Sequence, residues 1–248
     1  MNRLRRPLLD HLIPTLSLIT ALLVLANLAG LVVKFHLGEP SAHGWVPMFD
    51  LDGERNVPSF FSTGLIMLCA AAMALLSDHD RPVNRVAWLG LCLIFVFLAA
   101  DELISLHERL IEPVRYGLHT SGLLYLGWLL PYGLAAAAIG LGYLRFLLRL
   151  PKSIRNGILA AATAYLSGAL VLEAVGGAYL ESLHDVHNLP YELLTTLEET
   201  LEMGGMIGLL KVLMGHLTGA RHPRPRVRQS VSAAEPRPPL ASAMTREA

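Results

Sequence analysis

The sequence predicts an all-α membrane protein, a bundle of six transmembrane helices with both ends of the chain in the cytoplasm. Of the 248 residues, 53% are apolar and 16% are charged, and the mean hydropathy is +0.48. Soluble domains carry about 25% charged residues, so the soluble and disordered classes are excluded. Two cysteines cannot form a disulfide scaffold. A formal net charge of zero gives no bias towards nucleic acid.

Six apolar stretches have the length of about 20 residues that a membrane crossing needs. They are residues 12–34, 59–77, 86–106, 122–148, 157–180 and 197–217. The first stretch is longer than the apolar region of a secretory signal, and no cleavage site of small residues follows it. We therefore expect it to stay in the protein as a helix. The third stretch meets Asp101 and Glu102 near its end.

Lysine and arginine residues predict the orientation of these spans, because they concentrate in cytoplasmic segments. With the N-terminus in the cytoplasm, sixteen of the 20 basic residues fall on the inner side and four on the outer side. The opposite orientation would invert this ratio. The four outer residues are Lys34, Arg55, Arg109 and Arg115.

The sequence divides into a transmembrane domain, residues 1–217, and a basic tail, residues 218–248. The tail is rich in Arg, Pro, Ser and Ala and has no periodic apolar pattern. This composition predicts a disordered cytoplasmic tail. We interpret its arginines as solvated residues that help to fix the cytoplasmic orientation of the chain. The alternative is that they contact anionic lipid.

Carboxylates gather on the predicted outer side, which holds fifteen of the 20 acidic residues. Asp50, Asp52, Glu112 and Asp185 are interpreted as ordinary loop acids. Others lie inside apolar helices. With a rise of about 1.5 Å per residue, Asp101 lies about 24 Å from Arg85, Glu173 about 27 Å from Arg155, and Glu202 about 21 Å from His216. Three helices thus place acids at one depth.

Acids inside a membrane are costly, usually face the bundle interior and usually mark function. On a continuous helix, Asp101, Ser105 and Glu108 share a stripe with Glu102 beside it, and His107 lies on a different side. Glu198, Glu199 and Glu202 can all face inward. We also expect Gly204 and Gly208, four residues apart, and the pair Gly176-Gly177 to allow close helix contact.

Carboxylate and imidazole ligands together suit iron, manganese or zinc. A di-iron bundle would need two Glu-x-x-His motifs, and the chain has one, Glu181 to His184. If the fifth helix extends beyond the lipid, Glu173, His184 and His187 share a face. A standard di-iron site is therefore not expected, and a different carboxylate-rich metal site stays open.

The segment from Glu54 to Ser59 has two interpretations. Asn56 caps the helix that begins near Pro58, with Glu54 as a loop residue, or the segment belongs to the site at the outer lip of the membrane.

These motifs resemble those of an uncharacterised family of bacterial six-span integral membrane proteins. The resemblance covers about residues 10–217 and rests on Glu54-x-Asn56-x-Pro58, on Asp101-Glu102 with His107-Glu108, and on Glu202-Met203-x-Gly205. It implies a multi-pass protein of the bacterial inner membrane and no known activity. A fainter similarity, through Glu54, Asn56, Ser62 and Asp101, is to membrane-embedded zinc hydrolases of the alkaline ceramidase and adiponectin receptor type. Those proteins have seven spans and a final His-x3-His, where this chain has Glu198-x3-Glu202.

The leading hypothesis is an enzyme that binds a divalent metal and acts on a lipid or another apolar substrate. Asp101, Glu102 and Glu108 are the candidate catalytic residues. The alternatives are a cation- or proton-coupled transporter and a non-catalytic assembly subunit. The absence of an internal repeat argues against the transporter. The candidate metal ligands are Glu54, Glu102, His107, Glu108, Glu173, His184, Glu199 and Glu202.

Overall fold

The computed structural model describes residues 5–184 and 186–219, which fold into helices and connections without a β-strand. Five helical stretches are long and apolar enough to cross a membrane. This result confirms the all-α class and indicates a multi-pass membrane protein. The predicted tail lies, apart from its first two residues, outside the described residues. The five stretches are His11–His36, Val57–His79, Pro82–Ile104, Leu129–Arg149 and Lys152–Ser182.

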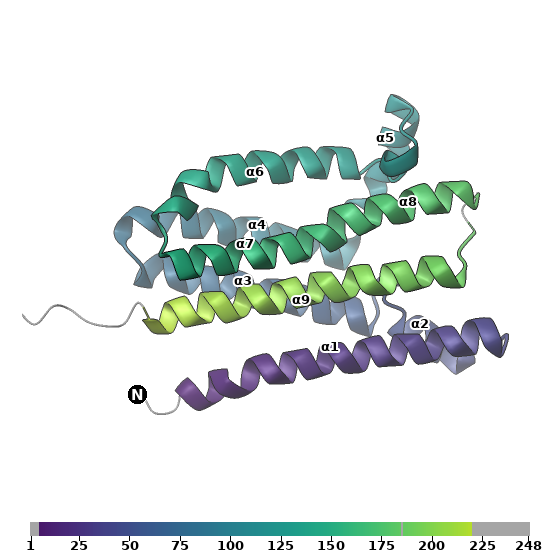
Figure 1. Ribbon diagram of the computed structural model, residues 1–248, viewed down its shortest axis with the longest axis horizontal. Helices are drawn as coiled ribbons and strands as arrows, with labels where there is room; N and C mark the ends of the chain where they lie inside the picture. Colours follow the sequence, from purple (N-terminus) through teal and green to yellow (C-terminus); the bar gives the residue numbers. More distant parts are fainter. Residues whose placement is uncertain (1–4, 185, 220–248) are drawn as a thin grey trace, which may run out of the picture.

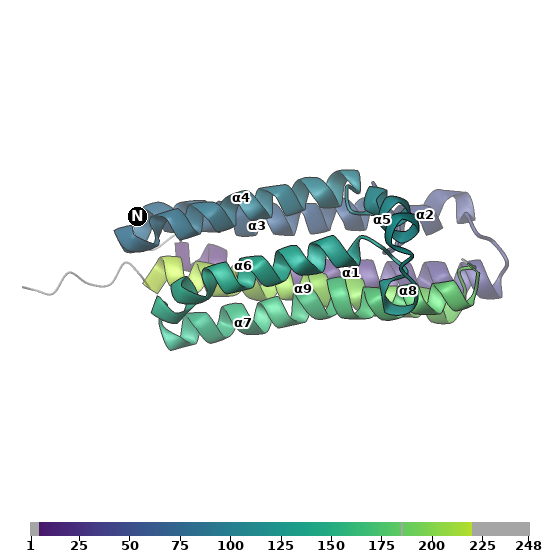
Figure 2. The ribbon, with the colours of Figure 1, turned by 90° about the horizontal axis from the view of Figure 1, so that it is seen from above.

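The long helices run side by side along one axis (Figures 1 and 2). They are α1 (Arg5–His36), α3 (Val57–His79), α4 (Arg85–Ile104), α6 (Leu129–Arg149), α7 (Lys152–Leu166) continued by α8 (Glu173–Ser182), and α9 (Leu189–Gly219). The helix α9 packs against α1, α3 and α7 and is the centre of the bundle. The start of α1 and the end of α9 lie at the same end, called here the termini end. The other is the far end.

Buried apolar side chains of α3, α4, α7 and α9 form the main core. Leu76, Trp88 and Leu213 are completely buried there. Cys69 is also buried, Cys92 is partly buried, and both are free thiols, as expected for apolar helix positions. Short elements cap the far end, namely α2 (Trp45–Phe49) and α5 (Ile111–Leu118).

Two of the predicted spans, the third and the fourth, are shorter in the structure. The helix α4 stops at Ile104, because Ser105 adopts a left-handed backbone with φ of 51° and turns the chain. The helix α6 begins at Leu129 rather than near residue 122. Before it, Gly122 has a positive φ and begins a short 3-10 helix, Gly122–Leu124, and Gly127 lies against the backbone of Arg115 in α5. The α-helix of the fourth span therefore does not extend back to residue 122.

The fifth span contains a π-helical turn over Ser167–Leu172, between α7 and α8. Such turns insert one residue into a helix and are frequent at functional sites. Here the turn directly precedes Glu173 and therefore sets the direction of that side chain. It also brings Gly168 against the backbone of α9, where a Cβ would lie 2.7 Å from the carbonyl oxygen of Glu198.

Close contact between α7 and α9 depends on Gly205. A Cβ there would lie 2.8 Å from the backbone nitrogen of Tyr165 and 3.0 Å from the carbonyl oxygen of Ala161. A Cβ on Gly204 would meet nothing within 4 Å. The prediction that Gly204 and Gly208 provide the contact was therefore wrong for Gly204. The face of α9 that meets α7 contains Gly205, the next residue along the helix, in its place. Gly177 does allow close contact, because a Cβ at this position would lie 2.9 Å from the side chain of Leu126.

A buried polar cluster joins α3, α4 and α9 at the termini end. The carboxylate Oδ2 of Asp80 accepts hydrogen bonds from Trp88 Nε1 at 2.8 Å and from Asn84 Nδ2 at 2.9 Å, and it lies 3.5 Å from His216 Nε2. Burial would raise the pKa of Asp80, but these hydrogen bonds and the nearby His216 lower it below its usual value. The charged carboxylate therefore stabilises this end of the bundle.

Candidate functional site

A cavity of about 800 Å³ lies between α4, α6, α7 and α9. Acidic side chains line its far end, and the remainder of its wall is almost entirely apolar down to Trp88 and Leu213. Among the described residues that line it there is no lysine or arginine. The acidic lining residues are Asp52, Glu54, Asp101, Glu102, Glu108, Glu173, Glu198, Glu199 and Glu202.

The structure brings nearly all the predicted site residues to this cavity. The one that does not line it is His184, because α8 ends at Ser182 and His184 adopts a positive φ of 54° and is exposed. The fifth helix therefore does not carry Glu173, His184 and His187 on one face as expected. The predicted residues that do line the cavity are Glu54, Asp101, Glu102, His107, Glu108, Glu173, Glu199 and Glu202.

The turn at Ser105 places His107 against Asp101. The imidazole Nδ1 lies 3.0 Å from Asp101 Oδ2, and the backbone N–H of His107 donates to Asp101 Oδ1 at 2.9 Å. Tyr132 Oη donates to the same Oδ1 at 2.9 Å. The prediction that His107 lies on a different side from Asp101 was wrong, because it assumed a helix that continues past residue 104.

This pairing sets the chemistry of the imidazole. A carboxylate that already accepts two other hydrogen bonds holds the proton on Nδ1, so the lone pair of Nε2 is free for a metal. The indole of Trp128 lies beside the ring, with centroids 4.8 Å apart. Burial would lower the pKa of His107, but the hydrogen bond to Asp101 and the charges of Asp101 and Glu108 raise it above its usual value.

Glu54 is positioned by a capped helix start. Asn56 and Ser59 form a reciprocal capping box at the beginning of α3, which confirms the cap predicted at Asn56. Asn56 Nδ2 also donates to the carbonyl oxygen of Asp50 at 2.6 Å, which closes the turn that presents Glu54. The cap and the site are therefore not alternatives. The cap holds Glu54 at the cavity.

Glu54, His107 and Glu108 form the candidate metal group. Ligand atoms of these three residues all lie within 4.8 Å of one another, close enough to surround one ion. The Oε2 atom of Glu54 is buried and makes no hydrogen bond. A buried carboxylate oxygen without a partner is costly unless a cation or water binds it. Burial and the charge of Glu54 raise the pKa of Glu108.

A second set of acids, called here the helix carboxylates, comes from α4, α8 and α9. Within this set, Glu198 and Glu173 hydrogen-bond to each other, and Glu202 hydrogen-bonds to Tyr165. Two carboxyl groups in contact need either a shared proton or a cation between them. Trp128 Nε1 donates to Glu173 at 3.3 Å. The helix carboxylates are Glu102, Glu173, Glu198, Glu199 and Glu202.

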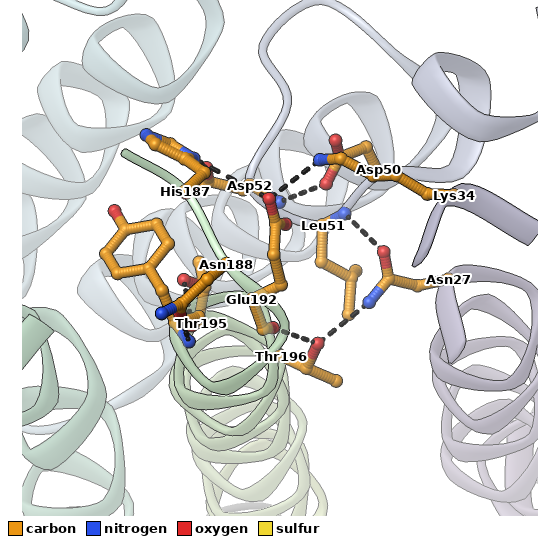
Figure 3. A network of polar contacts seen from close by, with 11 residues as sticks. Asn27, Lys34, Asp50, Leu51, Asp52, His187, Asn188, Glu192, Thr195 and Thr196 are labelled. Atoms are coloured by element: carbon orange, nitrogen blue, oxygen red, sulfur yellow. Dashed lines mark hydrogen bonds and ion pairs between the residues drawn. The ribbon is translucent and has the colours of Figure 1, made fainter. Parts of the chain in front are cut away.

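A network of polar contacts holds the loop before α3 against α1 and α9 (Figure 3). Lys34 Nζ at the end of α1 lies 2.7 Å from Glu192 Oε1 at the start of α9, and the Glu192 side chain is only 2% exposed. His187 Nδ1 lies 3.6 Å from both Glu192 and Asp52. Burial and the charges of Glu192 and Asp50 raise the pKa of Asp52 to about 7.

Asn27 completes this network on the α1 side. Its side chain donates to Thr196 Oγ1 at 2.8 Å and accepts from the backbone N–H of Leu51 at 3.2 Å. The loop that carries Asp52 and Glu54 is therefore fixed to two helices.

Sequence reasoning missed several residues of the site. Asp52 has the sequence context of an ordinary loop acid, yet it lines the cavity. Trp128, Tyr132 and Tyr165 are not among the predicted site residues, although they contact the acids. Aromatic residues with a polar atom, at the depth of unpaired acids, are the signal that could have found them.

The fold and the cavity define a multi-pass helical membrane protein with a carboxylate- and histidine-lined site. The chain belongs to a family described as a domain of unknown function, DUF8692, which matches residues 16–217. No curated protein and no solved structure matches the chain. The similarity to alkaline ceramidases and adiponectin receptors therefore has no support, whereas membership of an uncharacterised family agrees with the motif resemblance.

Proposed function

We propose that this protein is a metal-dependent enzyme that acts on a lipid or another apolar substrate within the membrane. The observation that carries the proposal is the geometry of Glu54, His107 and Glu108, whose ligand atoms lie within 4.8 Å of one another at the cavity wall. Asp101 supports it by orienting His107, the arrangement commonly found behind histidines that bind metals.

The donor set indicates the type of ion. Two carboxylates and one imidazole suit iron, manganese or zinc better than calcium or copper(I). Three protein ligands leave a coordination position open for water or substrate, as in catalytic zinc sites. Glu102 interacts electrostatically with Glu54 and His107 and also lines the cavity, so it is placed to act as a general base.

We further propose six membrane spans, with α9 as the sixth, in an inner membrane and with both termini in the cytoplasm. The helix α9 has 31 residues, runs along the same axis as the five apolar stretches, and packs against α1, α3 and α7. The termini end carries the predicted inner arginines such as Arg85 and Arg149. The acids would then face the outer leaflet. Attachment of a membrane-impermeant thiol reagent to a His43→Cys variant from outside the cell tests this orientation.

The distribution of polar groups favours a fixed site over a conduit. A proton or cation path needs polar groups along its whole length. The acids occupy one end of the cavity, and between them and Trp88 the described lining is apolar apart from the hydroxyl of Tyr143. Transport stays the alternative if no reaction chemistry is found.

Metal analysis of the detergent-purified protein tests the proposal. We expect about one iron, manganese or zinc per chain, lost in Glu54→Gln and in His107→Asn. The exposed acid Glu39, which does not line the cavity, provides the matched control Glu39→Gln, which should keep the metal. A metal content that is zero in the wild type, or equal in all four proteins while each is monodisperse, would refute the metal site.

A further inference from the structure

We propose that the cavity binds one long-chain lipid with a cationic amine head group, with the amine against the helix carboxylates and the chain along the apolar wall of α6. This inference rests on the proposed function in so far as such a lipid would be the substrate. The evidence for it is the shape and charge of the cavity, which are independent of a bound metal.

The cavity has the length of a lipid chain. Its lining on α4 runs from Asp101 to Trp88. At about 1.5 Å per residue, this distance is about 20 Å along the helix. One leaflet contributes about 15 Å to the hydrocarbon core. An occupant whose polar group meets the acids therefore needs an apolar part at least as long as an ordinary acyl chain.

The helix α6 forms one wall of the cavity, and the residues at the middle of this wall are small. The helix makes only sparse close backbone contacts with its neighbours. It lines the cavity with Tyr132, Ala136, Gly140 and Tyr143, a stripe at helical spacing whose middle is made of small residues. Its other face is apolar and exposed, with Leu141 75% accessible. On this side, α6 alone separates the cavity from the surrounding lipid.

The charge of the cavity selects the head group. Nine acidic residues and no lysine or arginine are found among the described lining residues. A divalent ion bound by Glu54, His107 and Glu108 would neutralise two of these acids and leave the helix carboxylates. Glu173 and Glu198 are already in hydrogen-bond contact and need a proton or a cation between them. An amine supplies that cation, whereas a phosphate head group would be repelled.

Three probes with the same chain and different heads test this assignment. They are hexadecylamine, hexadecanol and hexadecyl phosphate, each titrated into the purified full chain in detergent with binding followed by native mass spectrometry. We expect the amine to bind at least about tenfold more tightly than the alcohol, the effect of one charge interaction in a site of reduced dielectric. The phosphate should bind most weakly. Equal binding of all three, or preference for the phosphate, would overturn the proposal.

Two kinds of variant separate the head site from the chain site. Glu202→Gln should reduce the ratio of the affinities for the amine and the alcohol to about a third of the wild-type ratio or less. The affinity for the alcohol should stay unchanged. Gly140→Phe fills the chain site and should weaken both probes. Leu141→Phe, its neighbour on the lipid side of α6, is the matched control and should weaken neither. If Gly140→Phe and Leu141→Phe bind the probes alike, the chain does not lie along α6.

Metal content is measured on the same samples. Gly140→Phe should keep the metal of the wild type, because residue 140 is remote from Glu54. A protein that contains metal but shows no preference for the amine refutes the lipid assignment alone. A protein that prefers the amine but lacks metal refutes the enzyme proposal alone.

Discussion

Replacing Asp101 by asparagine should weaken metal binding at Glu54, His107 and Glu108 without removing a ligand. The carboxylate of Asp101 accepts from the His107 backbone, from the His107 ring and from Tyr132. Asparagine has the same size, but one of its two polar atoms is an N–H donor. When that donor faces Nδ1 of His107, the ring proton moves to Nε2, which is the atom needed by the metal.

The expected loss is 10- to 100-fold in metal affinity, the usual cost of changing the partner behind a metal-binding histidine. This corresponds to about 1.4–2.7 kcal/mol. Tyr132→Phe removes one of the three hydrogen bonds and leaves the charge, so its effect should be several-fold smaller. Competition with a chelator of known affinity, followed by elemental analysis, measures both variants against the wild type.

The pH dependence provides a second readout of the same variant. The raised pKa values of His107 and Glu108 mean that protons compete with the metal, so the affinity of the wild type should fall as the pH falls through these values. Without the charge of Asp101, the pKa of His107 is lower, and the contribution of this residue to the fall should move to lower pH. An Asp101→Asn variant with wild-type affinity and an unchanged pH profile would refute the assigned role of Asp101.

Three further predictions concern stability, each measured by thermal or denaturant unfolding in detergent. Lys34→Met leaves Glu192 buried and should cost about 3 kcal/mol, and adding Glu192→Gln should restore part of this loss. If the double variant loses as much free energy of unfolding as the two single variants lose together, the pair is not coupled. Asp80→Asn should destabilise by about 1–3 kcal/mol at pH 7. The pKa of Asp80 is lowered in the folded protein. The difference in stability between the wild type and Asp80→Asn should therefore have its full size above the unfolded pKa of 3.8 and disappear as the pH falls through the pKa of the folded protein. A difference that grows below pH 4 would contradict this. Gly205→Ala should cost about 1–3 kcal/mol, since its Cβ would meet backbone atoms of α7, and Gly204→Ala should cost much less. Equal effects at residues 204 and 205 would place the contact face elsewhere.

The positions of the membrane-crossing helices and the depth of the acids could both be predicted from the sequence. Hydropathy locates a span because the lipid core demands a fixed length of apolar helix. The fixed rise of a helix then converts residue number into depth, which is why Asp101, Glu173 and Glu202 could be expected at one level. All three side chains line the same cavity.

The sequence also predicted the cap at Asn56 as one of two interpretations, because capping depends on a few adjacent residues, and the structure confirms it. It could not determine that α4 stops at Ile104. A left-handed serine is unfavourable by itself, and it is stabilised by the hydrogen bonds that the turn allows between His107 and Asp101.

Only the tertiary structure decided which acids meet. Rotation of α9 towards α7 depends on Gly205 and Gly168, whose contacts lie between helices distant in the chain. The network of Lys34, His187 and Glu192 fixes the loop that carries Glu54. Composition and spacing thus determined a helical protein with several apolar spans and with acids at similar positions along three of its helices. Packing between helices decided that Glu54, His107 and Glu108 form one group, because side-chain contacts across a bundle depend on helix rotation and backbone turns that local sequence does not specify.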